Sequence, residues 1–240
     1  MINDTIDNVS WEADKEKEQT REFFKSVYAY MVGALATSGI IAYMAGTPEF
    51  VLKYFISAET GGVAPLFYVV AFAPVGLALL IQMGYQRMSV GVLMLAFFAY
   101  SVLIGLSLST IVLVYSGSAI ALTFFVTAGA FGGMAFLGYT TKMDLTRMGS
   151  LLYMVFIGMF IASIVNIFIG WETMSFIISV LGVFVFTGLT AYYMQRLKSV
   201  AQDETLSGLE KNKLALVGGL QLYILFVNLF LSLLNLLGRD

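Results

Sequence analysis

Three amide side chains recur along the last apolar stretch of the chain, and they are the first residues that could do chemistry. Gln221, Asn228 and Asn235 are spaced seven residues apart, so in a helix they share one face. Because an amide without a hydrogen-bond partner is costly to bury in hydrocarbon, this face must contact protein or water. Two interpretations stay open: hydrogen bonds between helices, or the wall of a polar pathway for an ion. Asn166, in an earlier apolar stretch, is a candidate partner for these amides.

Most catalytic and metal-binding chemistry is excluded by the residue types that the chain lacks. Its 240 residues include no Cys and no His, which excludes disulfides, thiolate zinc sites, histidine-ligated haem, and catalysis by Cys or His. The apolar stretches also contain no Asp, Glu, Lys or Arg, so neither paired carboxylates nor a lysine base lies within them. We therefore expect no enzyme activity, no catalytic residue, no cofactor, no resident metal and no nucleic-acid partner.

The elements that must position the amides are membrane helices. Apolar residues make up 59% of the chain and charged residues 12%, against about 45–50% and about 25% in soluble domains. A helix needs about 20 apolar residues to cross a bilayer, and seven stretches meet this length: 27–44, 65–83, 90–114, 119–138, 150–169, 175–193 and 214–237. The sequence predicts an all-α integral membrane protein, a seven-transmembrane-helix bundle whose last helix lies in the bundle interior, because the amide face of that helix must contact protein or water.

The basic residues gather on one side of this predicted bundle. Eleven Lys and Arg residues fall in the tail before the first stretch and in the loops after the second, fourth and sixth. Only Lys53 and Arg239 fall on the other side. The positive-inside rule therefore predicts a cytoplasmic N-terminus and an external C-terminus. The three amides leave one alternative open, in which the last stretch is re-entrant and the C-terminus returns to the inside.

The first 26 residues are polar and of mixed charge, so we divide the chain into a cytoplasmic N-terminal tail, 1–26, and a seven-helix transmembrane domain, 27–240. The tail is interpreted either as a solvated arm or as a short helix that lies on the membrane or binds a partner. Between the first two spans, Phe50 and Tyr54 have helical spacing, which predicts a short amphipathic helix on the outer surface.

Small residues spaced four apart predict where these helices pack closely. The pairs are Gly105 with Ser109, Ala128 with Gly132, Gly129 with Gly133, and Gly158 with Ala162. Small residues let two helix backbones approach each other within a bilayer. We therefore expect these four pairs to form packing contacts between helices, with no part in binding a substrate.

Two further strings of residues carry a family resemblance. The first, Gly-Tyr-Thr-Thr-Lys-Met-Asp-Leu, closes the fourth span, and the second, Gly-Leu-Thr-Ala-Tyr, closes the sixth ahead of Gln195 and Lys198. Together with Leu-Tyr in the last span, they resemble the Bax inhibitor (transmembrane Bax inhibitor motif) family of the bacterial type, from about residue 20 onward. The positions that carry the resemblance are Gly138, Thr140, Lys142, Asp144, Thr190, Tyr192 and Tyr223.

The resemblance implies a fold, a location and two kinds of function. It implies a multi-pass protein of the bacterial cytoplasmic (inner) membrane, a seven-transmembrane-helix bundle with the last helix central and enclosed by the other six. Bacterial relatives are associated with a pH-sensitive leak of calcium, and others modulate a membrane-anchored AAA protease. The implied partners are the lipid bilayer, calcium or another cation, and a membrane protease or other membrane protein.

The sequence departs from the family at the two positions that gate the leak. In the family pattern, one aspartate follows Ala-Tyr at the inner end of the sixth span and a second lies early in the seventh. Two facing carboxylates that share a proton can titrate near neutral pH. Tyr193 and Leu225 occupy these positions here, and neither side chain titrates in that range. The implied function is therefore a cation leak, or a membrane-homeostasis role, with the acidic gate absent.

Overall fold

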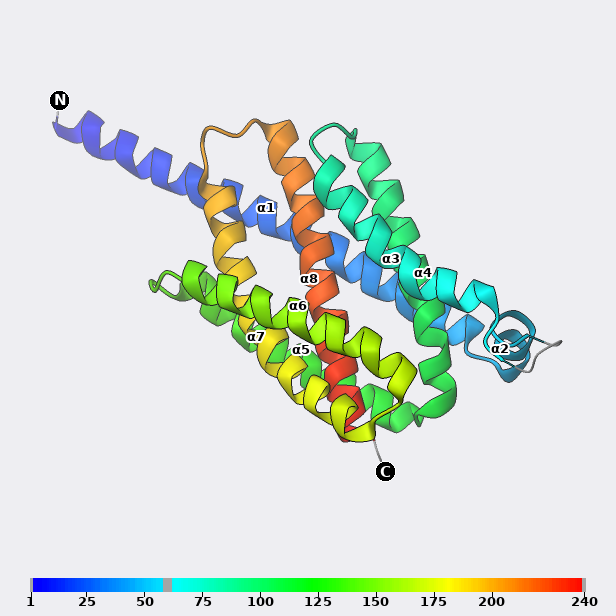
Figure 1. The fold of residues 1–240 in the computed structure, drawn as a ribbon. Helices are drawn as coiled ribbons and strands as arrows, with labels where there is room; N and C mark the ends of the chain where they lie inside the picture. Colours follow the sequence, from blue (N-terminus) through cyan, green and yellow to red (C-terminus); the bar gives the residue numbers. More distant parts are fainter. Residues whose placement is uncertain (1, 58–61, 239–240) are drawn as a thin grey trace.

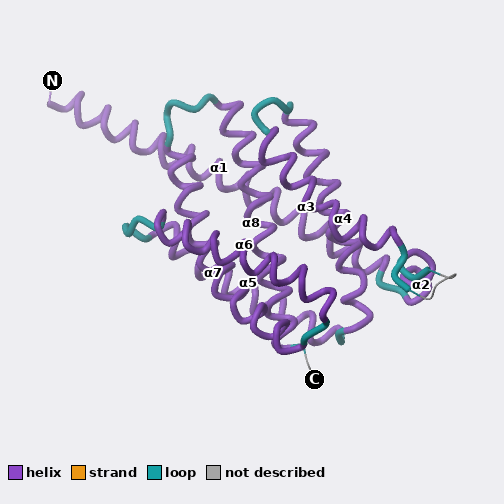
Figure 2. Tube along the Cα trace, in the orientation of Figure 1, coloured by secondary structure: helices purple, strands orange, loops and turns teal. Residues whose placement is uncertain are grey.

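The computed structural model describes residues 2–57 and 62–238, with side chains from residue 15 onward. The described residues form eight helices, joined by short loops (Figures 1 and 2). Seven of these helices are long and apolar enough to cross a membrane, which confirms the predicted helical membrane bundle. The helices are α1 (Ile2–Ala45), α2 (Pro48–Tyr54), α3 (Pro65–Gly84), α4 (Val90–Val114), α5 (Gly117–Thr140), α6 (Thr146–Ile169), α7 (Glu172–Gln202) and α8 (Gly208–Leu237).

Several breaks between helices fall at residues whose side chains or conformation satisfy the free backbone groups of a helix end. The side chains of Ser89 and Ser116 accept hydrogen bonds from the first turns of α4 and α5, as N-cap residues do. Ser207 and Glu210 form a capping box at the start of α8. Gly170, with φ +72°, ends α6 in the left-handed conformation, which glycine adopts without a steric penalty. Polar caps thus divide a nearly continuous apolar sequence into separate spans.

Helix α8 lies at the centre of the bundle, as predicted. It packs against α1, α4, α5 and α7, and it runs through the middle of the molecule (Figure 1). In its most apolar stretch 67% of the residues are buried, against at most 39% in any other span. Leu220, Tyr223 and Leu229 of α8 have no exposed surface. A helix surrounded in this way contacts protein on nearly every face.

Helix α1 continues without a break through residue 26, where the sequence analysis placed the end of the tail. Phe23 and Phe24 are 6% and 8% exposed and belong to the main hydrophobic core. The packed bundle therefore begins before residue 27. The first turns of α1 project beyond the bundle (Figure 1).

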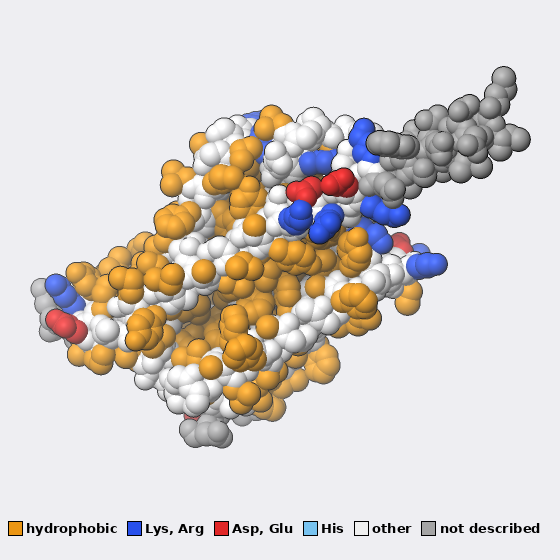
Figure 3. All heavy atoms as spheres, turned by 180° about the vertical axis from the view of Figure 1, so that it is seen from behind, with side chains coloured by type: hydrophobic (Ala, Val, Ile, Leu, Met, Phe, Trp, Pro, Cys, Tyr) orange, Lys and Arg blue, Asp and Glu red, His pale blue; other side chains and the backbone are white. Residues whose placement is uncertain are grey.

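The outer surface of the bundle is apolar. Leu95, Phe125 and Phe168 are 70%, 71% and 83% exposed. Hydrophobic side chains (orange) cover the middle of the face shown in Figure 3, and most of the Lys and Arg visible there (blue) gather toward one end. We call this the basic end. It comprises residues 15–26 of α1 and the loops 85–89, 141–145 and 203–207, and α2 lies at the opposite, far end (Figure 1).

The small-residue pairs pack closely at only one of the predicted places. A Cβ atom on Gly105 of α4 would lie 2.8 Å from the carbonyl oxygen of Ser38 in α1, so this pair forms a close helix contact. The predictions for the other three pairs were wrong. Cβ atoms on Gly129, Gly132 and Gly158 would meet nothing within 4 Å, because these glycines face the outside of the bundle or a groove in it.

The short helix predicted between the first two spans is present as α2. The Thr47 side chain caps it by accepting a hydrogen bond from the Phe50 backbone N–H at 3.2 Å. Phe55, directly after the helix, is only 3% exposed. Its ring packs edge-on against Phe50 and Phe67. These contacts hold α2 against the far end of α3.

Candidate functional site

The amide face of α8 turns toward α7 and α6. Asn228 and Asn235 line a cavity of about 210 Å³ between α6, α7 and α8. Gln221 does not reach this cavity. Its side chain lies beside the Tyr193 hydroxyl of α7. The three amides are half-buried, whereas Leu220, Leu222 and Leu229 of the same helix have no exposed surface.

The polar side chains that line the cavity are uncharged amides and hydroxyls, beside several apolar side chains. Ser163 and Ser179 each donate their hydroxyl proton to a carbonyl of their own helix, at 2.8 Å. Ser232 does the same to the Asn228 carbonyl, at 2.8 Å. A hydroxyl that donates in this way keeps its oxygen lone pairs as acceptors. The Asn235 Oδ1 atom is buried and has no hydrogen-bond partner. The serine hydroxyls that line the cavity therefore keep neutral oxygens that can accept from water or bind a cation.

The sequence analysis missed the three serines of this cavity. Ser232 follows Asn228 by four residues, so extending the amide face by one turn would have found it. Ser163 and Ser179 lie on different helices, and their sequence positions give no indication that they meet Asn235 at one cavity.

Asn166 does not join the amide face, so its predicted pairing with the α8 amides was wrong. Its Nδ2 atom donates to the Ser175 hydroxyl at 2.8 Å, and its Oδ1 atom accepts from the Trp171 backbone N–H at 3.0 Å. Both bonds close the turn between α6 and α7. Asn166 is therefore a structural residue of the far end.

The two degenerate gate positions lie in the core, on helices that pack against each other. Tyr193 of α7 is 5% exposed and Leu225 of α8 is 4% exposed. Leu225 follows Gln221 by one helical turn, and Gln221 lies beside Tyr193. The Tyr193 ring also packs against Tyr153 and Tyr192, with centroids 6.2 and 5.5 Å away. Aromatic and aliphatic side chains thus fill this level of the bundle.

Tyr223, another family position, is enclosed at the centre of the bundle. It has no exposed surface, and the rings of Phe97 and Tyr100 pack against it edge-on, with centroids 6.0 and 5.9 Å away. Ser38 of α1 lies beside its hydroxyl, without a hydrogen bond of ordinary geometry. Tyr223 therefore fills the junction between α8, α4 and α1.

The family string that closes α5 packs backbone to backbone on α7. A Cβ atom on Gly138 would overlap the carbonyl oxygen of Ala191 and lie 2.6 Å from its Cα. Likewise, a Cβ atom on Gly149 would lie 2.6 Å from the ring of Tyr192. Larger residues at either glycine would push α5 or α6 away from α7.

Two side chains of α7 then hold the loop between α5 and α6. The Gln195 amide accepts from the Leu145 backbone N–H at 2.9 Å and donates to the Met143 carbonyl at 2.7 Å. The Lys198 ammonium donates to the Tyr139 carbonyl at 3.0 Å and lies 4.8 Å from the centre of its ring. The family string at residues 138–145 therefore forms a loop that hydrogen bonds from α7 hold in place.

Several polar side chains at the family positions form hydrogen bonds with nearby backbone groups. The Asp144 carboxylate accepts from the Thr146 backbone N–H at 2.9 Å. Hydrogen bonds from Thr146, helped by the charge of Arg147, lower the pKa of this carboxyl. Thr140 and Thr190 each donate to a carbonyl one turn back, at 2.8 and 2.7 Å. Lys142 is exposed.

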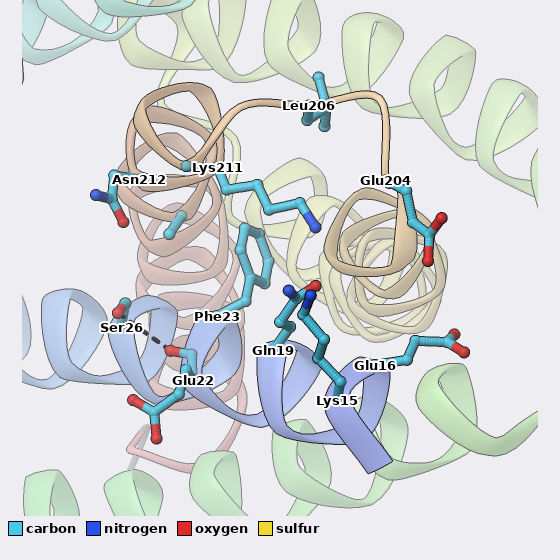
Figure 4. Close-up of a pocket in the computed structure, with 12 residues that line it drawn as sticks. Lys15, Glu16, Gln19, Glu22, Phe23, Ser26, Glu204, Leu206, Lys211 and Asn212 are labelled. Atoms are coloured by element: carbon cyan, nitrogen blue, oxygen red, sulfur yellow. Dashed lines mark hydrogen bonds between the residues drawn. The ribbon is translucent and has the colours of Figure 1, made fainter. Parts of the chain in front are cut away.

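A second, larger hollow lies at the basic end. This cleft has a volume of about 770 Å³ and lies between α1, the α7–α8 loop and the start of α8. Lys211 reaches from α8 toward the end of α7, where it donates to the Ala201 carbonyl at 3.0 Å. Lys15 and Gln19 rise toward it from α1 (Figure 4). The cleft is polar and carries both charges, because Glu204 lines it as well.

Comparisons with known proteins agree with this architecture. The family model described as "Inhibitor of apoptosis-promoting Bax1" matches residues 20–240. The chain is 37% identical to the inner membrane protein YbhL of Escherichia coli over 90% of this chain and 91% of that protein. It is 41% identical to a Caulobacter vibrioides protein over 92% and 89% of the two chains, and 38% identical to a Rickettsia prowazekii protein over 92% and 91%.

The similar inner membrane protein and the seven apolar helices support a multi-pass protein of the inner membrane. The matched region begins at residue 20, where α1 enters the packed core, and it includes every family position described above. The chain belongs to the Bax inhibitor family.

Proposed function

We propose that this protein is a weak cation leak of the bacterial inner membrane, without enzyme activity, whose pathway follows the amide face of α8. One observation carries the proposal: a cavity lined in part by neutral amide and hydroxyl groups lies between α6, α7 and the central helix α8, and the tightly packed Tyr193 and Leu225 lie on α7 and α8. Polar groups within a membrane protein commonly mark ion paths when they face the bundle interior. The basic end faces the cytoplasm in this proposal, as the positive-inside rule favours.

The absence of carboxylates sets the expected character of the leak. Calcium prefers oxygen ligands, and its affinity for a site rises with the number of charged ligands. The amide and hydroxyl oxygens at Asn228, Asn235 and Ser232 would therefore bind calcium only weakly. Because none of them titrates, and Tyr193 and Leu225 do not titrate near neutral pH, the flux should be small and nearly independent of pH.

The proposal is tested by measuring calcium uptake into liposomes that contain the purified protein. The natural sequence is compared with Tyr193→Asp/Leu225→Asp, which restores the two family carboxylates, and with Asn235→Leu, which removes an oxygen from the cavity. We expect slow uptake by the natural protein, faster and pH-dependent uptake by the double variant, and uptake reduced to the level of empty liposomes for Asn235→Leu. Uptake by the natural protein no faster than that of empty liposomes would overturn the proposal, whatever the double variant does.

A second function is favoured by the cleft at the basic end, where charged side chains of α1 and α8 surround a volume of about 770 Å³. In this alternative, the protein binds a membrane-anchored AAA protease through the cleft and the projecting part of α1. Deleting residues 2–14 leaves Thr20 and Phe23 buried in the bundle, so the fold should survive. If the deleted protein still co-purifies with the protease as well as the full chain does, the projecting segment is not the binding element.

A further inference from the structure

A long groove separates α1 from α5 near the basic end. It has a volume of about 630 Å³ and is lined by residues of α1, α5 and α7. Both α1 and α5 pack against α7 and α8, so the groove lies between two helices that share the same supports. Met194 of α7 lies at its floor, 2% exposed, where its sulfur accepts the Tyr28 hydroxyl at 3.7 Å.

The walls of the groove are apolar. Phe131 and Ala135 of α5 are each 5% exposed. Phe24 of α1 packs edge-on against Tyr139 of α5, with ring centroids 5.4 Å apart. Gly132 also lines the groove, and a Cβ atom there would meet nothing within 4 Å. The glycine thus leaves open the space that a side chain would otherwise fill.

One edge of the groove is basic. Lys17, Arg21 and Lys25 all line it, each four residues after the last, so they lie on one face of α1. Lys25 pairs with Glu22, while Arg21 has no acidic partner among the described residues. The Lys198 ammonium adds a positive charge beside Tyr139. The same groove therefore carries positive charge at its outer edge and hydrocarbon along its walls.

We propose that this groove binds one anionic phospholipid. Its phosphate would lie against Arg21 and Lys25, and an acyl chain would lie along Gly132 and Phe131. Arg pairs with phosphate through two parallel N–H donors, and basic clusters at the ends of membrane helices attract anionic lipid headgroups. The position supports a lipid, because the basic residues stand at the end of a membrane-spanning helix and the apolar walls continue into that span. A soluble phosphate would leave those walls uncovered.

The proposal is tested by counting bound lipids on the full chain by native mass spectrometry from a non-ionic detergent. The chain is titrated with dioleoyl-phosphatidylglycerol, with dioleoyl-phosphatidylcholine, and with inorganic phosphate. We expect one phosphatidylglycerol to bind more tightly than phosphatidylcholine, and inorganic phosphate not to compete with it. Equal binding of the two lipids, or displacement of phosphatidylglycerol by inorganic phosphate, would overturn the proposal.

The basic edge is tested with Arg21→Gln/Lys25→Gln. Each basic residue near an anionic surface contributes about 1 kcal/mol, or about a fivefold change in affinity. We therefore expect phosphatidylglycerol to bind about 25-fold more weakly to this variant. The matched control is Lys142→Gln/Arg147→Gln, which removes two exposed charges at the same end but outside the groove. An equal loss in the control would mean that overall charge attracts the lipid and that no site exists.

The apolar wall is tested with Gly132→Leu, which should fill the groove without disturbing the bundle. Its control is Gly129→Leu, about one turn earlier on α5. A Cβ atom at Gly129 also meets nothing within 4 Å, but Gly129 does not line this groove. We expect Gly132→Leu to lower the affinity for phosphatidylglycerol at least tenfold and Gly129→Leu to leave it unchanged. Unchanged binding of phosphatidylglycerol to Gly132→Leu would contradict the proposal. So would a dimer of the natural protein that carries no bound lipid and that Gly132→Leu converts to a monomer.

Discussion

Gly138 and Gly132 lie six residues apart on α5 and have opposite surroundings. Gly138 lets α5 meet the backbone of α7 at Ala191, so nothing larger fits there. Gly132 faces the open groove between α5 and α1. A glycine in a membrane helix can therefore mark either a close contact between two helices or an open space, and only its neighbours in the fold decide which.

The largest expected change in stability tests the close contact between α5 and α7 at Gly138. Gly138→Ala should lower the free energy of unfolding by about 3 kcal/mol, because an added methyl group in a fully packed contact forces the backbones apart. Gly132→Ala should leave it unchanged or raise it slightly, since alanine favours a helix. Unfolding of both variants in mixed micelles, followed by circular dichroism, measures the difference. Equal stabilities would show that α5 and α7 do not meet as described.

A smaller loss of stability is expected where hydrogen bonds from α7 hold the loop between α5 and α6. Gln195→Ala would leave the Leu145 N–H and the Met143 carbonyl without their partner. This change should cost about 2 kcal/mol, the typical cost of leaving partly buried polar groups unpaired. Arg196→Ala, at the next and exposed position, is the control and should change the unfolding free energy by less than about 0.5 kcal/mol. Matching losses in the two variants would argue against a fastened loop.

On the open side of α8, removing a polar atom should stabilise the protein. The Asn235 Oδ1 atom is buried without a partner, so Asn235→Leu should raise the unfolding free energy by about 1 kcal/mol. Asn228→Leu is the comparison, because the Asn228 amide already donates to the Ile224 carbonyl at 2.8 Å, and it should bring no such gain. A loss of stability in Asn235→Leu would indicate that the oxygen has a partner in the membrane.

The smallest effect concerns pH and the loop between α5 and α6. The pKa of Asp144 is lowered in the folded protein by hydrogen bonds from Thr146. Its stabilising contribution is therefore present above the ordinary aspartate pKa of 3.8 and is lost as the pH falls through the lower folded value. The unfolding midpoint of the natural protein should fall more steeply than that of Asp144→Asn on acidification below about pH 4. Parallel pH profiles would show that the hydrogen bonds from Thr146 to the Asp144 carboxylate do not stabilise the fold.

The number of spans could be predicted from composition, and the interior position of α8 from the spacing of its amides. An apolar stretch has few alternatives to a helix in a bilayer, and amides such as Asn228 must be enclosed. The short helix α2 followed from local spacing in the same way. By contrast, the environments of Gly129, Gly132 and Asn166 depend on which helices become neighbours. That information is spread over distant parts of the chain, so local spacing could not supply it.

The candidate site was predicted only in part, for the same reason. The amides at Asn228 and Asn235 share a helix, and periodicity found them. The cavity also needs Ser163 and Ser179 from two other helices. The groove likewise joins the basic face of α1 to the wall of α5, and these segments lie about a hundred residues apart in the sequence.

The central claim is that a cation can pass along α8 without a titrating gate. It is tested most directly by the ratio of initial calcium uptake at pH 8 to that at pH 6, measured with the natural protein in liposomes. We expect measurable uptake above that of empty liposomes and a ratio near one, because positions 193 and 225 hold Tyr and Leu in place of carboxylates. A rise of several-fold between these two pH values would contradict it, since the neutral oxygens of the cavity could not produce such a change.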